Sequence, residues 1–195
     1  MDRTCEIERK TSETRIFARL NLDGTGMHEI STGIPFFDHM LTLFSVHGFF
    51  DLRIEASGDI DVDFHHTVED VGIVMGDAIS KALGDKKGIV RYGHAATPMD
   101  ETMGMVDIDL SGRPFLIYNL PETIQPATGF NAYLGKEFFR SVANLGGMNL
   151  HVNVLYGEND HHIIESVFKS FGRALDRATR IDERVKRILS SKGSL

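Results

Sequence analysis

Two short segments of this sequence carry the same set of side chains that can bind a metal. His65-His66-Thr67-Val68-Glu69 is the first segment, and His161-His162-Ile163-Ile164-Glu165 is the second. In a helix, residues three and four apart lie on one face, so this spacing predicts that all three side chains gather at one end of that face. The occurrence of two such segments favours a dinuclear metal site that arose by duplication.

The composition narrows the kind of protein that could carry such a site. Imidazole and carboxylate ligands without thiolates suit manganese, iron, zinc or cobalt and argue against a structural zinc site of the cysteine type. The single cysteine, Cys5, excludes an intramolecular disulfide and fits a reducing compartment. The net charge of −7 disfavours a nucleic-acid partner. The N-terminus is polar and no apolar run approaches the roughly 18 residues that cross a bilayer, so we expect a cytoplasmic protein without membrane association.

The metal motifs belong to a longer internal repeat. Residues 13–24 resemble residues 101–112, and the two histidine motifs follow at matching places further along the chain. Self-similarity on this scale indicates two copies of one supersecondary unit. The sequence therefore predicts a first unit over residues 1–95 and a second over residues 96–195, which together form one catalytic unit.

Each unit is expected to fold as strand, strand, helix, strand, helix. Residues 15–22 and 49–56 alternate polar and apolar side chains, as strands do. Residues 35–47 show helical apolar spacing and precede Gly48, which we expect to cap that helix. A further amphipathic helix begins at each histidine motif. The pattern predicts an α+β fold with internal duplication, in which each unit is a sheet with two helices on one face.

The repeat nominates two further ligands near the start of the preceding helix of each unit. The stretch that begins at Phe37 aligns with the stretch that begins at Gly135, which pairs His39 with Glu137. Both side chains can coordinate a metal, and open positions on such a metal are what catalysis needs. The eight predicted ligands are His39, His65, His66, Glu69, Glu137, His161, His162 and Glu165.

These residues together resemble the imidazoleglycerol-phosphate dehydratase family of histidine biosynthesis. The resemblance is carried by HHTVED, DHHIIES, FDHML, IDLSGRP and the terminal SSKG, and it extends from about Arg9 to Gly193. It implies ribosomal protein S5 domain 2-like repeats and a hydro-lyase that converts D-erythro-imidazole glycerol phosphate to imidazole acetol phosphate and water. It also implies two Mn²⁺ ions per active site and a homo-oligomer of 24 copies with sites between subunits.

The resemblance also implies roles for individual residues. One metal is expected on His39, His66, Glu69 and His162, and the other on His65, His161 and Glu165. The fourth ligand of the second metal is often histidine in the family, whereas this chain has Glu137, and a carboxylate is still a competent ligand. Glu13 matches the family's candidate acid-base residue. The expected substrate contacts are Glu13, His39, His47, His65, Glu69, Arg91, Arg113, His161, Lys169, Ser190, Ser191 and Lys192.

The chemistry of the substrate explains why two metals are needed. Its imidazole ring is the only group that can accept electrons, and metals on both ring nitrogens would favour the imidazolate form. Imidazolate can expel the hydroxyl through a diazafulvene-like intermediate, and loss of a further proton gives an enol that tautomerises to the ketone. Arginine, lysine and serine side chains would bind the phosphate.

Two other functions remain open on sequence grounds. A different dinuclear enzyme on the same scaffold, such as a hydrolase, would turn over an ester or amide rather than the imidazole substrate. A non-catalytic metal store or assembly module would lose metal or assembly in a His66→Ala variant without a catalytic phenotype. No phosphatase-type Asp-x-Asp-x-Thr segment precedes the repeats, so we expect a single activity.

Overall fold

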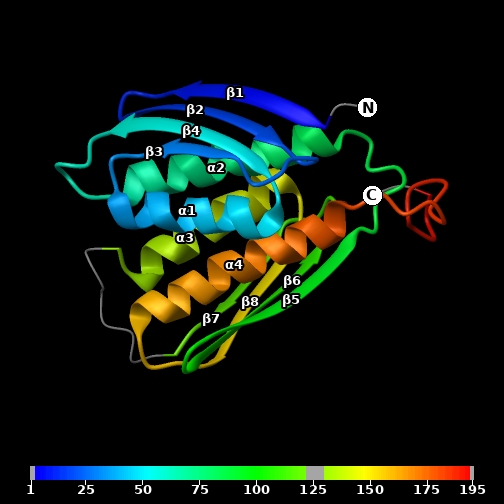
Figure 1. The fold of residues 1–195 in the computed structure, drawn as a ribbon. Coiled ribbons are helices and arrows are strands. Elements are labelled where there is room, and N and C mark those ends of the chain that lie inside the picture. Colours follow the sequence, from blue (N-terminus) through cyan, green and yellow to red (C-terminus); the bar gives the residue numbers. More distant parts are fainter. Residues whose placement is uncertain (1–2, 122–129, 194–195) are drawn as a thin grey trace.

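The computed structural model describes residues 3–121 and 130–193, in which one order of elements occurs twice (Figure 1). The first unit contains β1 (Thr4–Lys10), β2 (Thr14–Asn21), β3 (His28–Ser31), α1 (Pro35–Gly48), β4 (Asp51–Gly58) and α2 (His65–Leu83). The second contains β5 (Tyr92–Met99), β6 (Thr102–Asp109), β7 (Phe115–Asn119), α3 (Ala132–Gly146), β8 (Asn149–Tyr156) and α4 (Asp160–Thr179). The predicted α+β fold and its duplication are confirmed.

Each unit has one strand more than the sequence pattern predicted. The sheets have the orders β1-β2-β4-β3 and β5-β6-β8-β7. The last strand of each sheet, β3 or β7, pairs in parallel with its neighbour, while all other pairs are antiparallel. With four residues in β3 and five in β7, these edge strands are too short to show a clear alternation of polar and apolar side chains.

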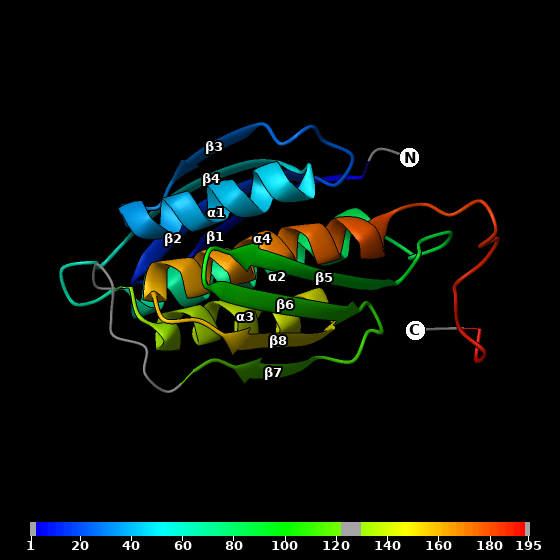
Figure 2. The ribbon, with the colours of Figure 1, turned by 60° about the horizontal axis from the view of Figure 1, so that its bottom comes forward.

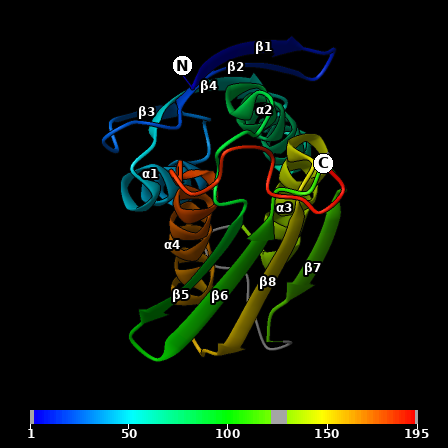
Figure 3. The same cartoon turned by 90° about the vertical axis from the view of Figure 1, so that its right-hand side faces the viewer.

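The two units pack helix to helix in four layers. α1 and α2 cover one face of the first sheet, and α3 and α4 cover one face of the second (Figure 3). In the middle of the molecule, α1 lies against α4 and α2 lies against α3. The apolar stripes of all four helices therefore face a shared interior between the two sheets.

Glycines allow the helices to approach at backbone distance. A Cβ atom on Gly76 of α2 would lie 2.8 Å from the carbonyl oxygen of Val142 and 2.9 Å from the amide nitrogen of Gly146 in α3. A Cβ on Gly172 of α4 would lie 2.5 Å from the carbonyl oxygen of Phe44 in α1. These separations are shorter than van der Waals contact, so glycine is required at both crossings.

The predicted role of Gly48 as a helix cap is wrong. α1 includes Gly48, and the left-handed residue that ends it is Phe49, with φ of 57°. A Cβ on Gly48 would lie 2.9 Å from the carbonyl oxygen of Gly172. The glycine is there because α4 passes close by, which local sequence patterns do not reveal.

Phenylalanine rings fill the space between the helices below the histidine motifs. Phe37 of α1 lies 5.5 Å from Phe130 and 5.4 Å from Phe138 of α3, measured between ring centroids. Phe138 lies 5.3 Å from Phe168 of α4, and all four rings are fully buried. Burial of one such ring contributes about 1.5–3 kcal/mol to the stability of the fold. These rings therefore stabilise the packing of the helices below their first turns.

All four helices begin at the same end of the molecule (Figures 1 and 2). The C-terminal tail lies at the opposite end (Figure 1). α4 has 20 residues and therefore separates the two ends by about 30 Å. No helix in the described part of the chain is long and apolar enough to cross a membrane.

The helix crossing at Gly76 makes a testable prediction for stability. We expect Gly76→Ala to lower the free energy of unfolding by about 1–2 kcal/mol, because overpacking costs about 1–3 kcal/mol and the better helix propensity of alanine returns up to about 1 kcal/mol. Urea unfolding of the metal-free protein measures this change. Lys136→Ala, at an exposed position of α3, is the matched control and should change stability by less than about 0.5 kcal/mol. Unchanged or increased stability of Gly76→Ala would contradict the close packing.

Candidate metal centre

Three of the predicted ligands meet where α1 and α4 begin side by side. The Nε2 atoms of His161 and His39 lie 3.0 Å and 3.5 Å from the same oxygen, Oε2 of Glu165. One ligand atom from each of the three residues lies within 4.8 Å of the others. His161 and Glu165 share a helix face by their spacing, whereas His39 joins them because α1 packs against α4. We call His39, His161 and Glu165 the α1–α4 cluster.

Local structure fixes the first turn of α4. Asn159 caps the helix, and its side-chain oxygen accepts hydrogen bonds from the backbone N–H groups of His161 at 2.9 Å and His162 at 3.4 Å. The ring of Phe36 meets that of His161 edge-on at 5.1 Å. These contacts restrict the orientation of the turn that carries the motif.

Glu165 is buried and contacts a cationic side chain as well as the two histidines. Its Oε1 lies 2.5 Å from Nζ of Lys169, one turn further along α4. Burial acts to raise the pKa of the Glu165 carboxyl, but the hydrogen bond and the charge of Lys169 outweigh it and leave the pKa below its ordinary value. The carboxylate is therefore ionised at neutral pH and able to bind a metal.

The equivalent position at the start of α2 and α3 is arranged differently. Nε2 of His65 lies 3.3 Å from Oε2 of Glu69, which repeats the geometry of α4. The buried Glu137, the repeat partner of His39, forms an ion pair with Arg140, whose guanidinium also lies 3.9 Å from Glu69. The described residues thus bring His65 and Glu69 together and place Arg140 between the two carboxylates.

The second histidine of each motif points away from the first. His162 Nδ1 lies 2.8 Å from Glu101 Oε2, and His66 Nδ1 lies 3.0 Å from Asp59 Oδ2. The two imidazole planes within each motif are nearly perpendicular, at 77° and 79°. Contrary to the expectation from helical spacing, the three side chains of a motif do not converge on one point within the chain.

The two arginines predicted to bind the phosphate lie at the far end of the molecule. The backbone N–H of Arg91 donates to the carbonyl of Ala178, at the end of α4, at 2.8 Å. His161, in the first turn of the same helix, lies 17 residues before Ala178, which places it about 26 Å away along the helix axis. Arg113 lies at the same far end, because the backbone N–H of the preceding Gly112 donates to the carbonyl of Gly147, just after α3, at 2.8 Å. A single chain does not bring these arginines to the α1–α4 cluster.

The tail residues are held near Arg91. The guanidinium of Arg91 pairs with Asp109 at 2.7 Å and 3.1 Å and donates to the carbonyl oxygen of Leu189 at 2.7 Å. Ser190, Ser191 and Lys192 follow directly, and Ser191 and Lys192 are exposed. Arg91 therefore orients the start of the Ser-Ser-Lys segment.

His47 lies on α1 beyond the α1–α4 cluster. Burial lowers the pKa of its imidazole, and the positive charges of Lys169 and Arg173 on α4 lower it further. The neutral form of His47 is thus favoured at neutral pH. A neutral imidazole in this place can accept or donate a hydrogen bond to a substrate.

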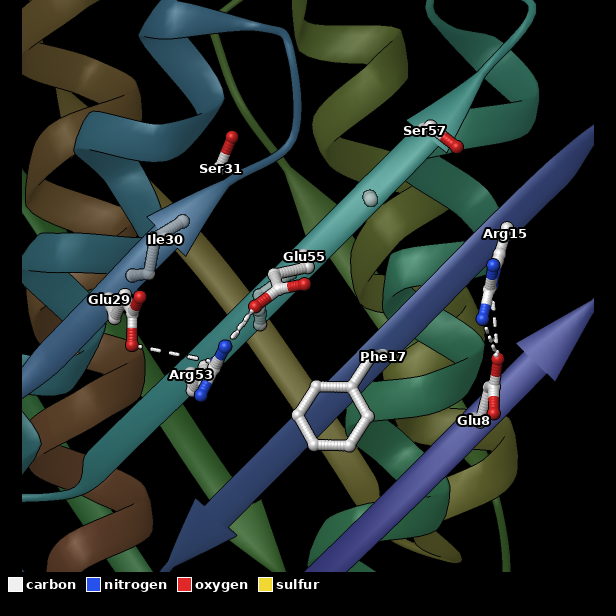
Figure 4. A pocket seen from close by; sticks show the side chains of 11 residues that line it. Glu8, Arg15, Phe17, Glu29, Ile30, Ser31, Arg53, Glu55 and Ser57 are labelled. Atoms are coloured by element: carbon white, nitrogen blue, oxygen red, sulfur yellow. Dashed lines mark hydrogen bonds and ion pairs between the residues drawn. The ribbon is translucent and has the colours of Figure 1, made fainter.

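A large hollow on the surface is unrelated to the histidines. It measures about 800 Å³ and lies on the face of the first sheet that points away from the helices (Figure 4). Its charged side chains pair with one another: Arg53 with Glu29 and Glu55, and Arg15 with Glu8 (Figure 4). No predicted ligand lines it, so it does not compete with the helix ends as the candidate site.

Comparison with known proteins decides the family. A sequence model of the imidazoleglycerol-phosphate dehydratase family matches residues 32–175. Imidazoleglycerol-phosphate dehydratases of Desulfosudis oleivorans and Trichlorobacter lovleyi are 59% and 60% identical to this chain over 195 residues, the whole length of each protein. The chain belongs to the imidazoleglycerol-phosphate dehydratase family. The family membership and the hydro-lyase activity expected from the sequence are confirmed.

Solved structures of the family have the same fold. The Staphylococcus aureus dehydratase superposes with a TM-score of 0.83 at 38% identity, over 92% of this chain and 99% of that one. The Pyrococcus furiosus enzyme, in complex with (S)-C348, gives a TM-score of 0.84 at 35% identity, over 97% and 100% of the two chains. The duplicated architecture is therefore that of the family.

Three side chains next to the predicted ligands had no role in the sequence analysis. Glu101 aligns with Glu13 in the repeat, and this alignment was a signal that could have identified it. Arg140 follows Glu137 at helical i, i+3 spacing, which also predicts an ion pair. Asp59 lies in an irregular loop before α2, and no sequence pattern marks it.

The α1–α4 cluster predicts how metal binding responds to a neutral ligand. We expect Glu165→Gln to reduce the metal bound per chain by roughly half, because one of two expected sites loses its carboxylate and an amide is a weaker ligand. Elemental analysis of protein equilibrated with Mn²⁺ measures the change. Glu6→Gln, at an exposed position of β1, is the control and should bind as much metal as the unchanged chain. Equal metal content in Glu165→Gln would remove Glu165 from the ligand set.

Proposed function

We propose that this chain dehydrates D-erythro-imidazole glycerol phosphate to imidazole acetol phosphate in the cytoplasm, as a step of histidine biosynthesis. The observation that carries the proposal is the full-length relationship to the family, together with the α1–α4 cluster. A hydrolase or a metal store could use the same cluster. Neither would account for identity of 59–60% to dehydratases over the whole chain.

The proposed cofactor is a pair of Mn²⁺ ions per site. His161 Nε2 and Glu165 Oε2, which we assign to one metal, lie 3.0 Å apart, close to the roughly 3 Å expected between neighbouring ligands of an ion with bonds of about 2.1 Å. The donors are nitrogen and oxygen atoms, which suit manganese. The pair of His161 and Glu165 therefore fits the proposed metal in both chemistry and spacing.

Within one chain, the side chains of each proposed ligand set do not all lie close together. One set is His39, His66, Glu69 and His162, and the other is His65, Glu137, His161 and Glu165. Within the chain, His39 instead lies beside His161 and Glu165. Glu137 would also have to exchange Arg140 for the metal. We propose that neighbouring copies complete both sets, in an assembly of 24 subunits.

The position of the phosphate contacts supports the same arrangement. Arg91 lies about 26 Å from His161 along α4, which is much longer than a substrate of one ring and a short carbon chain. We propose that Arg91, Arg113 and the tail of one copy bind the phosphate of a substrate whose imidazole lies at the metal end of another. Lys169 would contribute a positive charge from the metal end.

Glu13 is the proposed acid-base residue. Its side chain is half exposed, and its carboxylate lies 3.9 Å from His66 Nδ1. The Thr11 hydroxyl accepts a hydrogen bond from the backbone N–H of Glu13 at 3.1 Å and fixes the turn. When bound, the metals would polarise the imidazole ring and favour its loss of a proton. Glu13 would then move protons to and from the substrate carbon and hydroxyl.

The role of Glu13 leads to a prediction that also tests the function. We expect Glu13→Gln to lower kcat for release of imidazole acetol phosphate by about 10²–10⁴-fold with unchanged metal content, because the amide cannot exchange the proton. The assay uses Mn²⁺-loaded, assembled protein. Glu8→Gln, at an exposed position of the same sheet, is the control. Full activity of Glu13→Gln would exclude this role, and no turnover by the unchanged chain would favour the hydrolase or the metal store.

A further inference from the structure

The second histidine of each motif is held by a carboxylate through Nδ1. His162 Nδ1 lies 2.8 Å from Glu101 Oε2, and His66 Nδ1 lies 3.0 Å from Asp59 Oδ2. In contrast, the first histidines, His65 and His161, face their own motif's glutamate through Nε2. With Nδ1 engaged, His162 and His66 each keep only Nε2 for a further ligand, and in His162 this atom lies 3.8 Å from Asp100 Oδ2.

Glu101 is itself fixed by several donors. Its Oε1 accepts the backbone N–H groups of Asn159 at 2.9 Å and Glu158 at 3.3 Å, and the hydroxyl of Thr102 donates to it at 3.1 Å. One oxygen thus holds the loop that caps α4, and the other oxygen faces His162. The two oxygens are not interchangeable, because the donors lie on one side only.

The hydrogen bonds of Glu101 decide the tautomer of the ring. The Oε1 atom of Glu101 accepts three hydrogen bonds from N–H and O–H donors, which is the pattern of a carboxylate rather than of a carboxylic acid. An ionised carboxylate only accepts hydrogen bonds, so the hydrogen between the two residues belongs to His162 Nδ1. Nε2 of the neutral ring then carries a free lone pair.

We propose that Glu101 is a positioning residue that holds His162 in the tautomer and orientation in which Nε2 can bind a metal shared with another copy of this chain. The proposal rests on the proposed function, which assigns His162 to a metal. Ligating histidines commonly give their other N–H to a carboxylate, which sets the tautomer and increases ligand basicity. Glu101 occupies that place for His162.

Equivalent positions of the two units have different roles. Glu101 of the second unit aligns with Glu13 of the first, yet Glu13 Oε2 lies 3.9 Å from His66 Nδ1. In the first unit Asp59 is the closer partner of His66, at 3.0 Å. Because Asp59 orients His66, Glu13 is available for proton transfer, whereas Glu101 orients His162.

The decisive variant is Glu101→Gln. The amide oxygen can still accept the backbone N–H groups of Asn159 and Glu158, which directs the amide NH₂ group toward His162. That group donates to Nδ1, so the hydrogen of the ring moves to Nε2 and the lone pair for the metal is lost. We expect Mn²⁺ affinity at one of the two sites to fall by about 10–100-fold.

Three measurements separate positioning from a purely structural role. Calorimetric titration with Mn²⁺ reports the affinity, thermal unfolding of the metal-free chain reports the stability, and long-range ¹H–¹⁵N spectra of histidine-labelled, metal-free chain at alkaline pH report the tautomer. We expect the unchanged chain to show His162 protonated on Nδ1 and Glu101→Gln to show it protonated on Nε2. Glu158→Gln, an exposed change on the same loop, should match the unchanged chain in all three.

Each outcome bears on the proposal. Protonation of His162 on Nε2 in the unchanged chain overturns it, whatever the variant does. If Glu101→Gln lowers the Mn²⁺ affinity and the melting temperature together but leaves the tautomer unchanged, the proposal is also overturned. Glu101 would then only stabilise the loop that caps α4. Absence of Mn²⁺ binding by the unchanged chain would count against the proposed function, whereas the tautomer would still test the positioning by Glu101.

Discussion

Backbone contact between helices of different units is the constraint on which the structure depends. Gly172 of α4 touches α1 and Gly76 of α2 touches α3, and a Cβ at either position would collide with a backbone carbonyl. These crossings hold helices from the two units side by side, with all four helix starts at one end (Figure 1). As a result His39, which is distant in sequence, reaches Glu165.

Two of the buried carboxylates at this end are each balanced by a cation from the same helix. Glu165 pairs with Lys169, and Glu137 pairs with Arg140. An unpaired buried carboxylate would be costly, so the helix starts require positive charge. A metal that binds there adds to or exchanges with an existing ion pair, which links metal binding to the packing of the helices.

The sequence predicted the secondary-structure elements better than the tertiary contacts between them. The repeat and the hydrophobic periodicity identified the α+β duplication and the helices that begin at the motifs, because these depend on local spacing. The grouping of His39 with His161 and Glu165 depends on tertiary packing, and so does the reason for Gly48. The outward turn of His66 and His162 depends on Asp59, which no sequence pattern marks, and on Glu101, which only the repeat alignment with Glu13 could have indicated. The division into residues 1–95 and 96–195 stays a prediction.

The central claim is that each active site combines metal ligands of neighbouring copies with the phosphate contacts of a copy other than the one that supplies its His39. It is tested most directly by hybrid assemblies of two inactive variants, His39→Ala at the metal end and Arg113→Ala with Lys192→Ala at the far end. Co-expressed in equal amounts, they should recover about a quarter of the unchanged activity, because random pairing leaves about a quarter of shared sites intact. Hybrids that are as inactive as their parents would show that each chain carries a complete site and would contradict the account.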